Sequence, residues 1–209
     1  MKLKKLVAIT LSAVMCMAAL TGCGGKSDSA KKTAKVIEVD LTDEQYAFGV
    51  DKDQPDLLKE VNQFVKDMKS DGTFDEICNR YFGDGTPVPV KSAAYDESKD
   101  QLVVATNAAF EPFEYMDGEN YVGIDMEIAK ALADKLGKEL VIQNMDFDAV
   151  CLSVGQHKCD VAMAGLTIKP DREEYVAFSD PYYSASQKLI TLSTDTEFDA
   201  CKTADDVSK

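Results

Sequence analysis

The segment from Gly165 to Arg172 combines residue types that can hold a small carboxylate. It reads GLTIKPDR and lies between the apolar run VAMA and the charged residues EEY. We expect a short strand that ends in a glycine turn and leads into a helix with one arginine. The turn offers backbone N–H and C=O groups, the Thr167 hydroxyl can donate or accept, and the Arg172 guanidinium can bind both carboxylate oxygens. The plain alternative is a surface arginine on an ordinary helix, so the rest of the chain must decide.

Residues 101–192 alternate between strand and helix patterns around this segment. We predict strands at 101–106, 139–144 and 159–164, and amphipathic helices at 123–136 and 148–156. This alternation is typical of an α/β fold in which a mostly parallel sheet carries helices on both faces. Ligands of such sheets lie beyond the carboxyl ends of the strands. Residues 107–115, Phe147 and residues 165–172 should therefore meet in one crevice.

Residues 36–85 form a first block that is too small for a core of its own. A strand is expected at 46–50, a helix begins at Pro55, and a second helix follows the break at Gly72 and ends at Gly83. Two helices and one strand bury little apolar surface alone, so this block should pack on residues 101–192. Residues 86–100 are interpreted as a linker.

The first residues indicate secretion. Three lysines precede the apolar stretch 6–20, which is too short for a comfortable membrane span, so residues 1–22 are interpreted as a signal peptide. The sequence LTGC at 20–23 resembles the bacterial lipobox, which implies that Cys23 carries lipid. An ordinary signal peptide that happens to contain a cysteine is the alternative. Residues 23–35 would then be a flexible tether, and the protein would lie on the outer face of the bacterial cytoplasmic membrane, in an extracellular or periplasmic setting.

Composition excludes some partners. The formal charge is −14, and the signal peptide contributes only lysines, so the remaining chain is more acidic still. Such a surface repels nucleic acid and anionic lipid headgroups. The remaining cysteines, which exclude Cys23 and those of the signal peptide, fit no zinc pattern with the single histidine, His157. We therefore expect no metal site and no cofactor. Disulfides between Cys78, Cys151, Cys159 and Cys201 are left open.

Residues 123–136 read GIDMEIAKALADKL and match, position for position, the signature of the family 3 solute-binding proteins, the polar amino-acid receptors of ABC importers. The stretches FEPFEY at 110–115, AGLT at 164–167 and FSDPYY at 178–183 resemble other landmarks of that family. The resemblance covers roughly residues 101–192. It implies a periplasmic-binding-protein-like type II lobe that binds a free amino acid, works with a membrane permease and acts as a monomer.

The resemblance also implies roles for individual residues. Phe110 and Phe147 resemble the two aromatic residues that enclose the ligand's side chain. Gly165 and Thr167 resemble the groups that bind the α-amino and α-carboxylate ends, and Arg172 resembles the carboxylate clamp. Asn107 stands where some relatives carry an acid, which puts a preference for a basic ligand in doubt.

Other residues of these motifs are expected to be structural. Phe113 and Tyr115 should be core residues. Asp125 and Glu127 should lie on a solvated face of the helix rather than contact ligand. Glu111 and Glu114 should both face solvent or lie at core edges.

The order of the segments differs from the family pattern. Residues 36–85 resemble the carboxyl-terminal part of the first lobe, yet they precede its amino-terminal part at 101–192, so the chain reads as a circular permutant. An accidental fusion of two receptor fragments is the alternative. Residues 187–192 resemble a crossover strand and residues 193–209 the opening of a second lobe, most of which is missing. We therefore expect one lobe of a longer, two-lobed protein.

Two other classes of function compete with a receptor. The fold resembles that of a secreted cyclohexadienyl dehydratase, which would need a positioned acid or base in the cleft. The candidates near the cleft are Glu111 and Glu114. A sensing or interaction module, or a truncated lobe without independent binding, is the other possibility. We favour a receptor that performs no chemistry.

The lipobox leads to a first prediction. Cys23→Ser should release the protein from the membrane or leave it as unprocessed precursor, because a diacylated cysteine supplies the two chains that make an anchor stable. Membrane fractionation and the mass of the mature amino terminus provide the measurement. Unchanged fractionation of the variant would remove the lipidation hypothesis.

Overall fold

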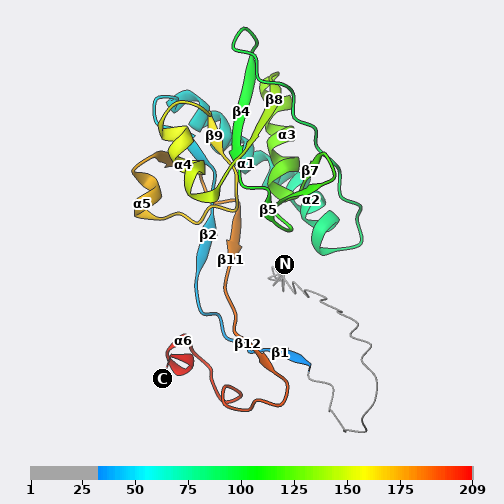
Figure 1. The fold of residues 1–209 in the computed structure, drawn as a ribbon, viewed down its shortest axis with the longest axis vertical. Coiled ribbons are helices and arrows are strands. Elements are labelled where there is room, and N and C mark those ends of the chain that lie inside the picture. Colours follow the sequence, from blue (N-terminus) through cyan, green and yellow to red (C-terminus); the bar gives the residue numbers. More distant parts are fainter. Residues whose placement is uncertain (1–32, 209) are drawn as a thin grey trace, which may run out of the picture.

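The computed structural model describes residues 33–208 and shows an α/β unit joined by two extended strands to a small second unit (Figure 1). The helices are α1 (Pro55–Asp71), α2 (Thr73–Phe82), α3 (Ile124–Leu136), α4 (Phe147–Gly155), α5 (Pro170–Glu173) and α6 (Ala204–Val207). The first six strands are β1 (Ala34–Val36), β2 (Glu44–Tyr46), β3 (Gly49–Asp51), β4 (Gln101–Thr106), β5 (Ala109–Phe110) and β6 (Glu114–Asp117). The others are β7 (Asn120–Val122), β8 (Glu139–Asn144), β9 (Val161–Ala162), β10 (Val176–Phe178), β11 (Tyr183–Ala185) and β12 (Ile190–Leu192).

The main sheet has the strand order β10-β3-β9-β4-β8. Strand β4 pairs in parallel with both β8 and β9, whereas β3 is antiparallel to β9 and to β10. All strands of this sheet except β3 therefore run in the same direction. The mostly parallel α/β lobe predicted from the sequence is confirmed, with one reversed strand in its interior.

Helices cover both faces of this sheet. Successive side chains of a strand point to opposite faces. Leu102 and Val104 of β4 pack in the core cluster that contains buried residues of α1 and α3. Val103 and Ala105 pack in the cluster with the buried residues of α4. Because both faces are covered, every residue of β4 is buried, which explains its almost uninterrupted apolar sequence.

Helix α1 shows how the sequence sets such an element. Pro55 stands at its first position, and Gly72, in the left-handed region at φ +92°, ends it. The apolar residues Val61, Phe64, Val65 and Met68 recur at helical spacing and are all buried against the sheet.

The first block, residues 36–85, shares the core of the main unit. Its strand β3 lies between β9 and β10, so the block completes the sheet. The single strand predicted at 46–50 is wrong in detail, because the chain changes partners there. Tyr46 pairs with Tyr183 of β11, whereas Gly49 pairs with Phe178 of β10 and Ala162 of β9. The strand predicted at 159–164 is shorter, since only 161–162 pair as a strand, β9.

The predicted tether and the predicted linker both pair with other parts of the protein, which their sequences do not indicate. The expected tether 23–35 overlaps β1, where Ala34 pairs with Leu192. Residues 86–100 have no helix or strand, but Val90 is buried and forms two backbone hydrogen bonds with Tyr121. This segment therefore lies against the lobe. Residues 1–32, which include the predicted signal peptide, Cys23 and most of the predicted tether, are outside the described part.

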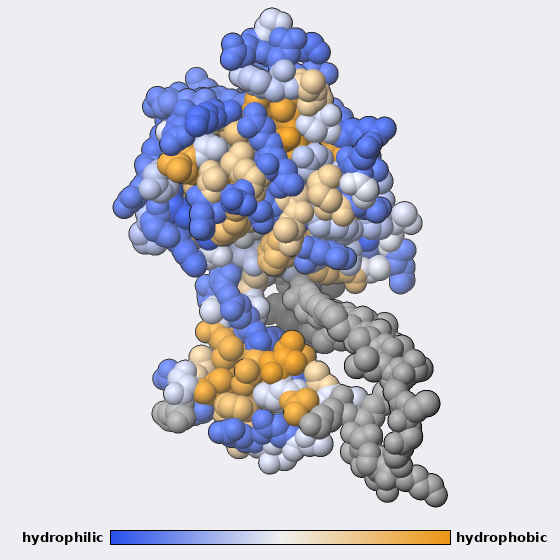
Figure 2. Space-filling view, viewed as in Figure 1, coloured by the Kyte–Doolittle hydropathy of each residue, from blue (hydrophilic) through white to orange (hydrophobic). Residues whose placement is uncertain are grey.

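Strands β2 and β11 pair with each other and connect the main unit to the small one (Figure 1). The small unit consists of the β1–β12 pair and α6, whose first turn has a capping box at Thr203. Figure 2 shows an apolar patch on this unit. Ile190 and Leu192 of β12 are 61% and 47% exposed. Between residues 33 and 208, no helix is both long and apolar enough to cross a bilayer.

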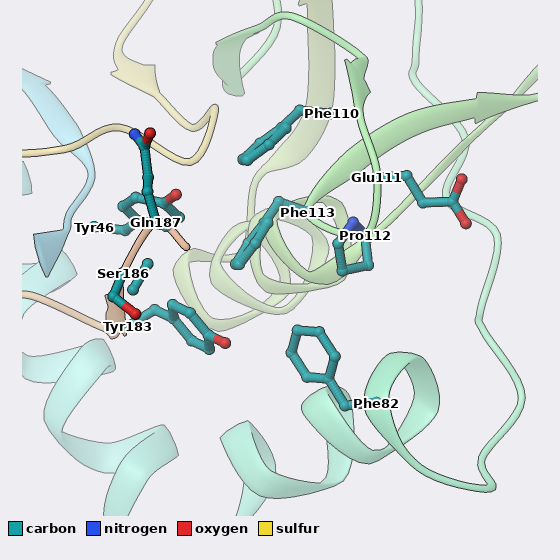
Figure 3. A pocket seen from close by; sticks show the side chains of 10 residues that line it. Tyr46, Phe82, Phe110, Glu111, Pro112, Phe113, Tyr183, Ser186 and Gln187 are labelled. Carbon is teal, nitrogen blue, oxygen red and sulfur yellow. The ribbon is translucent and has the colours of Figure 1, made fainter. Parts of the chain in front are cut away.

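An aromatic cluster lies where β2 and β11 leave the main unit (Figure 3). The ring centroids of Tyr46, Phe113 and Tyr183 are 5.1 to 5.9 Å apart, and Phe82 adds an edge contact to Phe113 at 6.4 Å. These residues come from four separate parts of the chain. The expectation that Phe113 is a core residue is confirmed, since only 5% of it is exposed.

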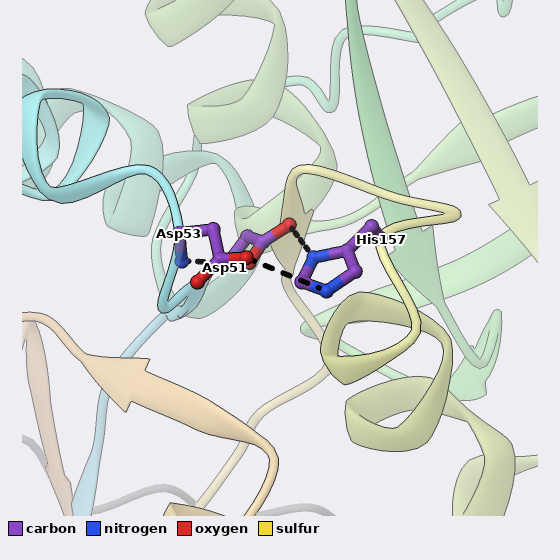
Figure 4. Close-up of side chains that lie close together, drawn as sticks. All are labelled: Asp51, Asp53 and His157. Atoms are coloured by element: carbon purple, nitrogen blue, oxygen red, sulfur yellow. Dashed lines mark hydrogen bonds and ion pairs between the residues drawn. The ribbon is translucent and has the colours of Figure 1, made fainter.

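Two further contacts connect distant segments. Gly123, just before α3, has φ +132°, and a β-carbon there would lie 2.1 Å from the Phe113 carbonyl oxygen. Asp51 at the end of β3 is buried and accepts a 2.8 Å contact from His157 Nδ1, while Nε2 lies 3.6 Å from Asp53 (Figure 4). The hydrogen bond with Asp51, and the charges of both carboxylates, raise the pKa of His157 above its usual value.

Substitution at Gly123 should be severely destabilising. Gly123→Ala should lower the free energy of unfolding by about 3 kcal/mol or more, because an unfavourable backbone conformation is combined with contact against rigid backbone atoms. Gly118→Ala is the matched control, since φ is +58° there but nothing lies within 4 Å of the added carbon. That change should cost about 1–2 kcal/mol. Equal losses in urea titrations of the two variants would contradict the steric explanation.

The ion pair of His157 should make stability depend on pH. Because the pKa is raised in the folded protein, the stabilisation is fully present below about pH 6.5 and is lost as pH rises through the folded-state pKa. The Tm advantage of wild type over His157→Gln should therefore disappear at alkaline pH. The chain has a single histidine, so NMR titration of its ring reads this pKa directly. A pKa at or below 6.5 would contradict the pairing.

Candidate ligand-binding site

The turn after β9 requires glycine at position 165. Gly165 has φ +52°, and a β-carbon there would lie 2.9 Å from a ring carbon of Phe110. Its backbone N–H donates to the Asp125 carboxylate at 2.9 Å. This hydrogen bond fixes the Gly165 turn to the first helical turn of α3. The Gly165 turn also lies against the Phe110 ring of β5. Its N–H is already used within the protein.

Thr167 is bound to the strand that leaves the main unit. It forms an isolated bridge with Tyr46, and its hydroxyl donates to the Glu44 carboxylate at 3.0 Å. Burial raises the pKa of Glu44, but hydrogen bonds from Gln187, Thr42 and Thr167 outweigh it and place the pKa below its usual value. Glu44 is a neighbour of the site that the sequence analysis did not identify. No local signal points to it, because 123 positions separate it from Thr167.

Arg172 is partly buried on the short helix α5, which Pro170 starts. Its guanidinium donates to the Thr167 carbonyl at 2.8 Å and lies 5.1 Å from the centroid of the Phe147 ring. This is a cation–π contact, which restricts the side chain without using all its donors. Within residues 33–208 the guanidinium forms no other hydrogen bond, so its remaining N–H groups are available to a ligand.

The two aromatic residues are among the exposed large apolar side chains. Phe110 is 43% exposed and Phe147 is 40% exposed. Phe110 stacks on Phe113, with centroids 5.4 Å apart and an angle of 16° between the ring planes. A cavity of about 270 Å³ opens beside it, lined by the aromatic cluster and by Ala185, Ser186 and Gln187 (Figure 3). Phe110 lines this cavity, whereas the other predicted contact residues do not.

Asn107 connects the ends of two parallel strands. Its side-chain N–H donates to the carbonyl of Met145 at 2.7 Å, beyond the end of β8. The amide group therefore fixes the loop after β4 to the loop before α4. The side chain can still offer a ligand its oxygen, as an acceptor, and its second N–H, as a donor.

The predicted stretches are linked as the strand-end rule requires. Phe110 touches Gly165, Asn107 binds the loop that precedes Phe147, and Arg172 covers the Phe147 ring. These contacts place the residues around one edge of the sheet, beyond the carboxyl ends of β4, β8 and β9.

The expectation for Asp125 and Glu127 is wrong. Asp125 is fully buried and Glu127 is 6% exposed. Glu127 accepts from the Tyr81 hydroxyl at 2.6 Å, from the Val88 N–H at 3.0 Å and from Arg80. Because the amino-terminal turn of α3 points into the body of the lobe, Glu127 meets donors from α2 and from the segment that follows it. Asp125 meets the Gly165 N–H and the Tyr182 hydroxyl instead. The same correction applies to Glu114, which is fully buried, whereas Glu111 is exposed.

Among residues 33–208, Asp51, Asp53 and His157 place three possible metal ligands within 4.8 Å of one another. The two ring nitrogens of His157 lie 2.8 Å from an Asp51 oxygen and 3.6 Å from an Asp53 oxygen (Figure 4). Within the same range, Cys78, Cys151, Cys159 and Cys201 are free thiols.

Comparison with known proteins gives the family. The family model of the bacterial extracellular solute-binding proteins, family 3, matches residues 8–84 and 102–206. The arginine-binding extracellular protein ArtP of Bacillus subtilis is 40% identical over 96 residues, which are 46% of this chain and 38% of ArtP. Cyclohexadienyl dehydratase of Pseudomonas aeruginosa is 34% identical over 92 residues, which are 44% of this chain and 34% of that enzyme.

Among solved structures, the arginine-bound form of domain 1 from TmArgBP is similar, with 37% identity and a TM-score of 0.40. The similarity covers 50% of this chain and 91% of that one. This chain spans well under half the length of the curated relatives named above. The family model, in contrast, matches most of the residues of this chain. The chain therefore belongs to the bacterial extracellular solute-binding proteins, family 3.

Proposed function

We propose that this protein is the amino-acid-binding lipoprotein of an ABC uptake transporter, anchored through Cys23 on the outer face of the cytoplasmic membrane. Membership of the solute-binding family supports a binding role. Relatives from Bacillus subtilis and Chlamydia trachomatis that are named for arginine support a free amino acid as the ligand. Its partners would be that amino acid and a membrane permease, and it would act as a monomer without a cofactor.

This proposal rests mainly on the orientation of the Arg172 guanidinium and on its unused N–H donors. Its guanidinium is oriented by the Thr167 carbonyl and the Phe147 ring, yet it keeps donors without a protein partner between residues 33 and 208. A planar fork of N–H groups matches the two oxygens of an α-carboxylate. The Thr167 hydroxyl, in contrast, already donates to Glu44 and would have to rotate to reach a ligand. Arg172 is therefore the preformed part of the site.

The side chain of the ligand would lie between Phe110 and Phe147. Both rings expose area to which an aliphatic stem can pack, and aromatic faces also attract cations. Asn107 contributes an oxygen acceptor at the same edge. A ligand tip rich in N–H donors, such as a guanidinium, suits this combination, so L-arginine is the first ligand to test.

We also propose that the chain is a circular permutant of one lobe. The family model matches two separate stretches, and β3 from the first stretch completes the sheet formed by the second. Receptors that close two lobes over a ligand bury it on both sides. A single lobe leaves the ligand partly solvated, so this chain should bind an amino acid weakly.

A dehydratase is the second candidate, favoured by the similarity to the Pseudomonas aeruginosa enzyme. The acids beside the cleft are Glu111, which is exposed, and Glu44, which is ionised and hydrogen-bonded. The hydrogen bonds that lower the pKa of Glu44 disfavour it as a general acid, and Glu114 is fully buried and does not line the cavity, so we rank this function second. Turnover of prephenate or arogenate by the purified protein would reverse this ranking.

The clamp is tested by replacing Arg172. Arg172→Lys keeps the charge but loses the fork, so affinity for L-arginine should fall about tenfold to a hundredfold. Lys169→Ala is the matched control, because it removes an exposed cation from the same turn and should leave affinity within about twofold. Calorimetry with a panel of amino acids provides the measurement. Equal affinities of wild type and Arg172→Lys would exclude Arg172 as the clamp.

A further inference from the structure

Glu114, the first residue of β6, is a buried acid without an evident partner. It is fully buried, and neither of its side-chain oxygens receives a hydrogen bond from any donor within residues 33–208. An ionised carboxylate in such a place would lose its hydration without compensation. Burial, and next the charge of Asp125, raise the pKa of Glu114 to about 11. The side chain therefore carries a proton at neutral pH.

Asp125, the second residue of α3, is equally buried but has donors on both oxygens. One oxygen accepts the Gly165 N–H at 2.9 Å and the other accepts the Tyr182 hydroxyl at 2.6 Å. Burial raises the pKa of Asp125 to about 6, while the hydrogen bonds from Gly165 and Tyr182 oppose that shift. Asp125 is therefore the member of the pair that is ionised at neutral pH.

We propose that Glu114 and Asp125 share one proton and position the Gly165 turn and the Phe110 ring for ligand. In this pair Glu114 is a neutral acid that donates to Asp125, and Asp125 is the carboxylate that holds the Gly165 N–H. Both act as positioning residues, since neither has to touch the ligand. The role toward ligand rests on the function proposed above, whereas the shared proton does not.

The pair connects two elements of the candidate site. Glu114 lies opposite Phe110 in the β5–β6 ladder, so it belongs to the hairpin that presents that ring. Asp125 holds Gly165, against which the same ring packs. The backbone N–H of Asp125 also donates to the Phe113 carbonyl at 2.9 Å. A change in the charge of this pair should therefore shift the Phe110 ring and the Gly165 turn together.

Among residues 33–208, no cation compensates the charge of the pair. The other titratable groups that interact with it are Tyr46 from β2, Cys78 from α2 and Tyr182 from the segment before β11. All three are neutral at physiological pH, and burial raises the pKa of each. Since no lysine, arginine or histidine contributes to the shift of either carboxyl, a second negative charge has nothing to offset it.

The sign of the pH effect follows from the raised pKa of Glu114. The folded protein keeps this proton above the unfolded pKa of about 4.5, so its stability falls as pH rises from that value toward 11. Glu114→Gln has nearly the same shape, donates to Asp125 and cannot ionise. The Tm of this variant minus that of wild type should therefore rise by about 5 °C or more between pH 5 and pH 9. Glu111→Gln, in the turn that precedes β6 and exposed, should show no such rise.

Infrared spectroscopy tests the shared proton without any ligand. At pH 8 the wild-type protein should show the carbonyl band of one protonated carboxylic acid, lost in Glu114→Gln and retained in Glu111→Gln. Hydrogen exchange at the Gly165 amide should become at least about tenfold faster in Asp125→Asn, because an amide oxygen is a weaker acceptor than a carboxylate. A missing band in wild type, or the same band in Glu114→Gln, would overturn the proposal.

Binding separates the two proposals. If wild type binds L-arginine, its affinity should fall at least about tenfold in Asp125→Asn, and this variant should also lose the pH dependence that wild type shows near pH 6, where Asp125 titrates. Unchanged affinity in Asp125→Asn, with faster exchange at Gly165, would overturn the positioning role. If wild type binds no amino acid, the proposed function fails, while the infrared band and the Gly165 exchange still decide whether the proton is shared.

Discussion

The main unit depends on the backbone hydrogen bonds of strand β3. This strand hydrogen-bonds to β9 on one side and to β10 on the other, so the sheet would be divided without it. Unpaired strand edges in the middle of a sheet cannot be left open, because backbone N–H and C=O groups there have no other partner. The first block of the chain therefore folds as part of the same lobe as residues 101–192. Its position in the sequence has no effect on this pairing.

The candidate site depends on the same sheet. Its residues follow β4, β8 and β9, whose carboxyl ends point to one edge. The first block adds Tyr46 and Glu44 from β2, which contact Thr167 and so connect the site to the strands that leave the unit. A site of this kind combines rigid strand ends with two extended connections. Movement about β2 and β11 would therefore reach Thr167 directly.

Charge is distributed unevenly around this edge. Arg172 provides the cation, while the carboxylates of Asp125 and Glu44 accept hydrogen bonds from the turn and Glu114 is buried. In a low-dielectric interior, two adjacent ionised carboxylates without a cation would be strongly unfavourable. Holding one proton between Glu114 and Asp125 removes that repulsion. It also leaves a carboxylate in place to orient the Gly165 N–H.

The sequence by itself determined the elements and the family of this protein. Helix α1 follows from Pro55, its apolar spacing and Gly72, and β4 from its apolar run, because these signals act over a few residues. The sequence likewise predicted the turn at Gly165 and the order of the stretches that form the candidate site. Tertiary structure decided which acids are buried and what they contact. Asp125 meets Gly165 from 40 positions away, His157 meets Asp51 from 106 and Thr167 meets Glu44 from 123. A helix position that looks solvated from its own periodicity becomes interior when a distant segment covers it, and no local pattern records that contact.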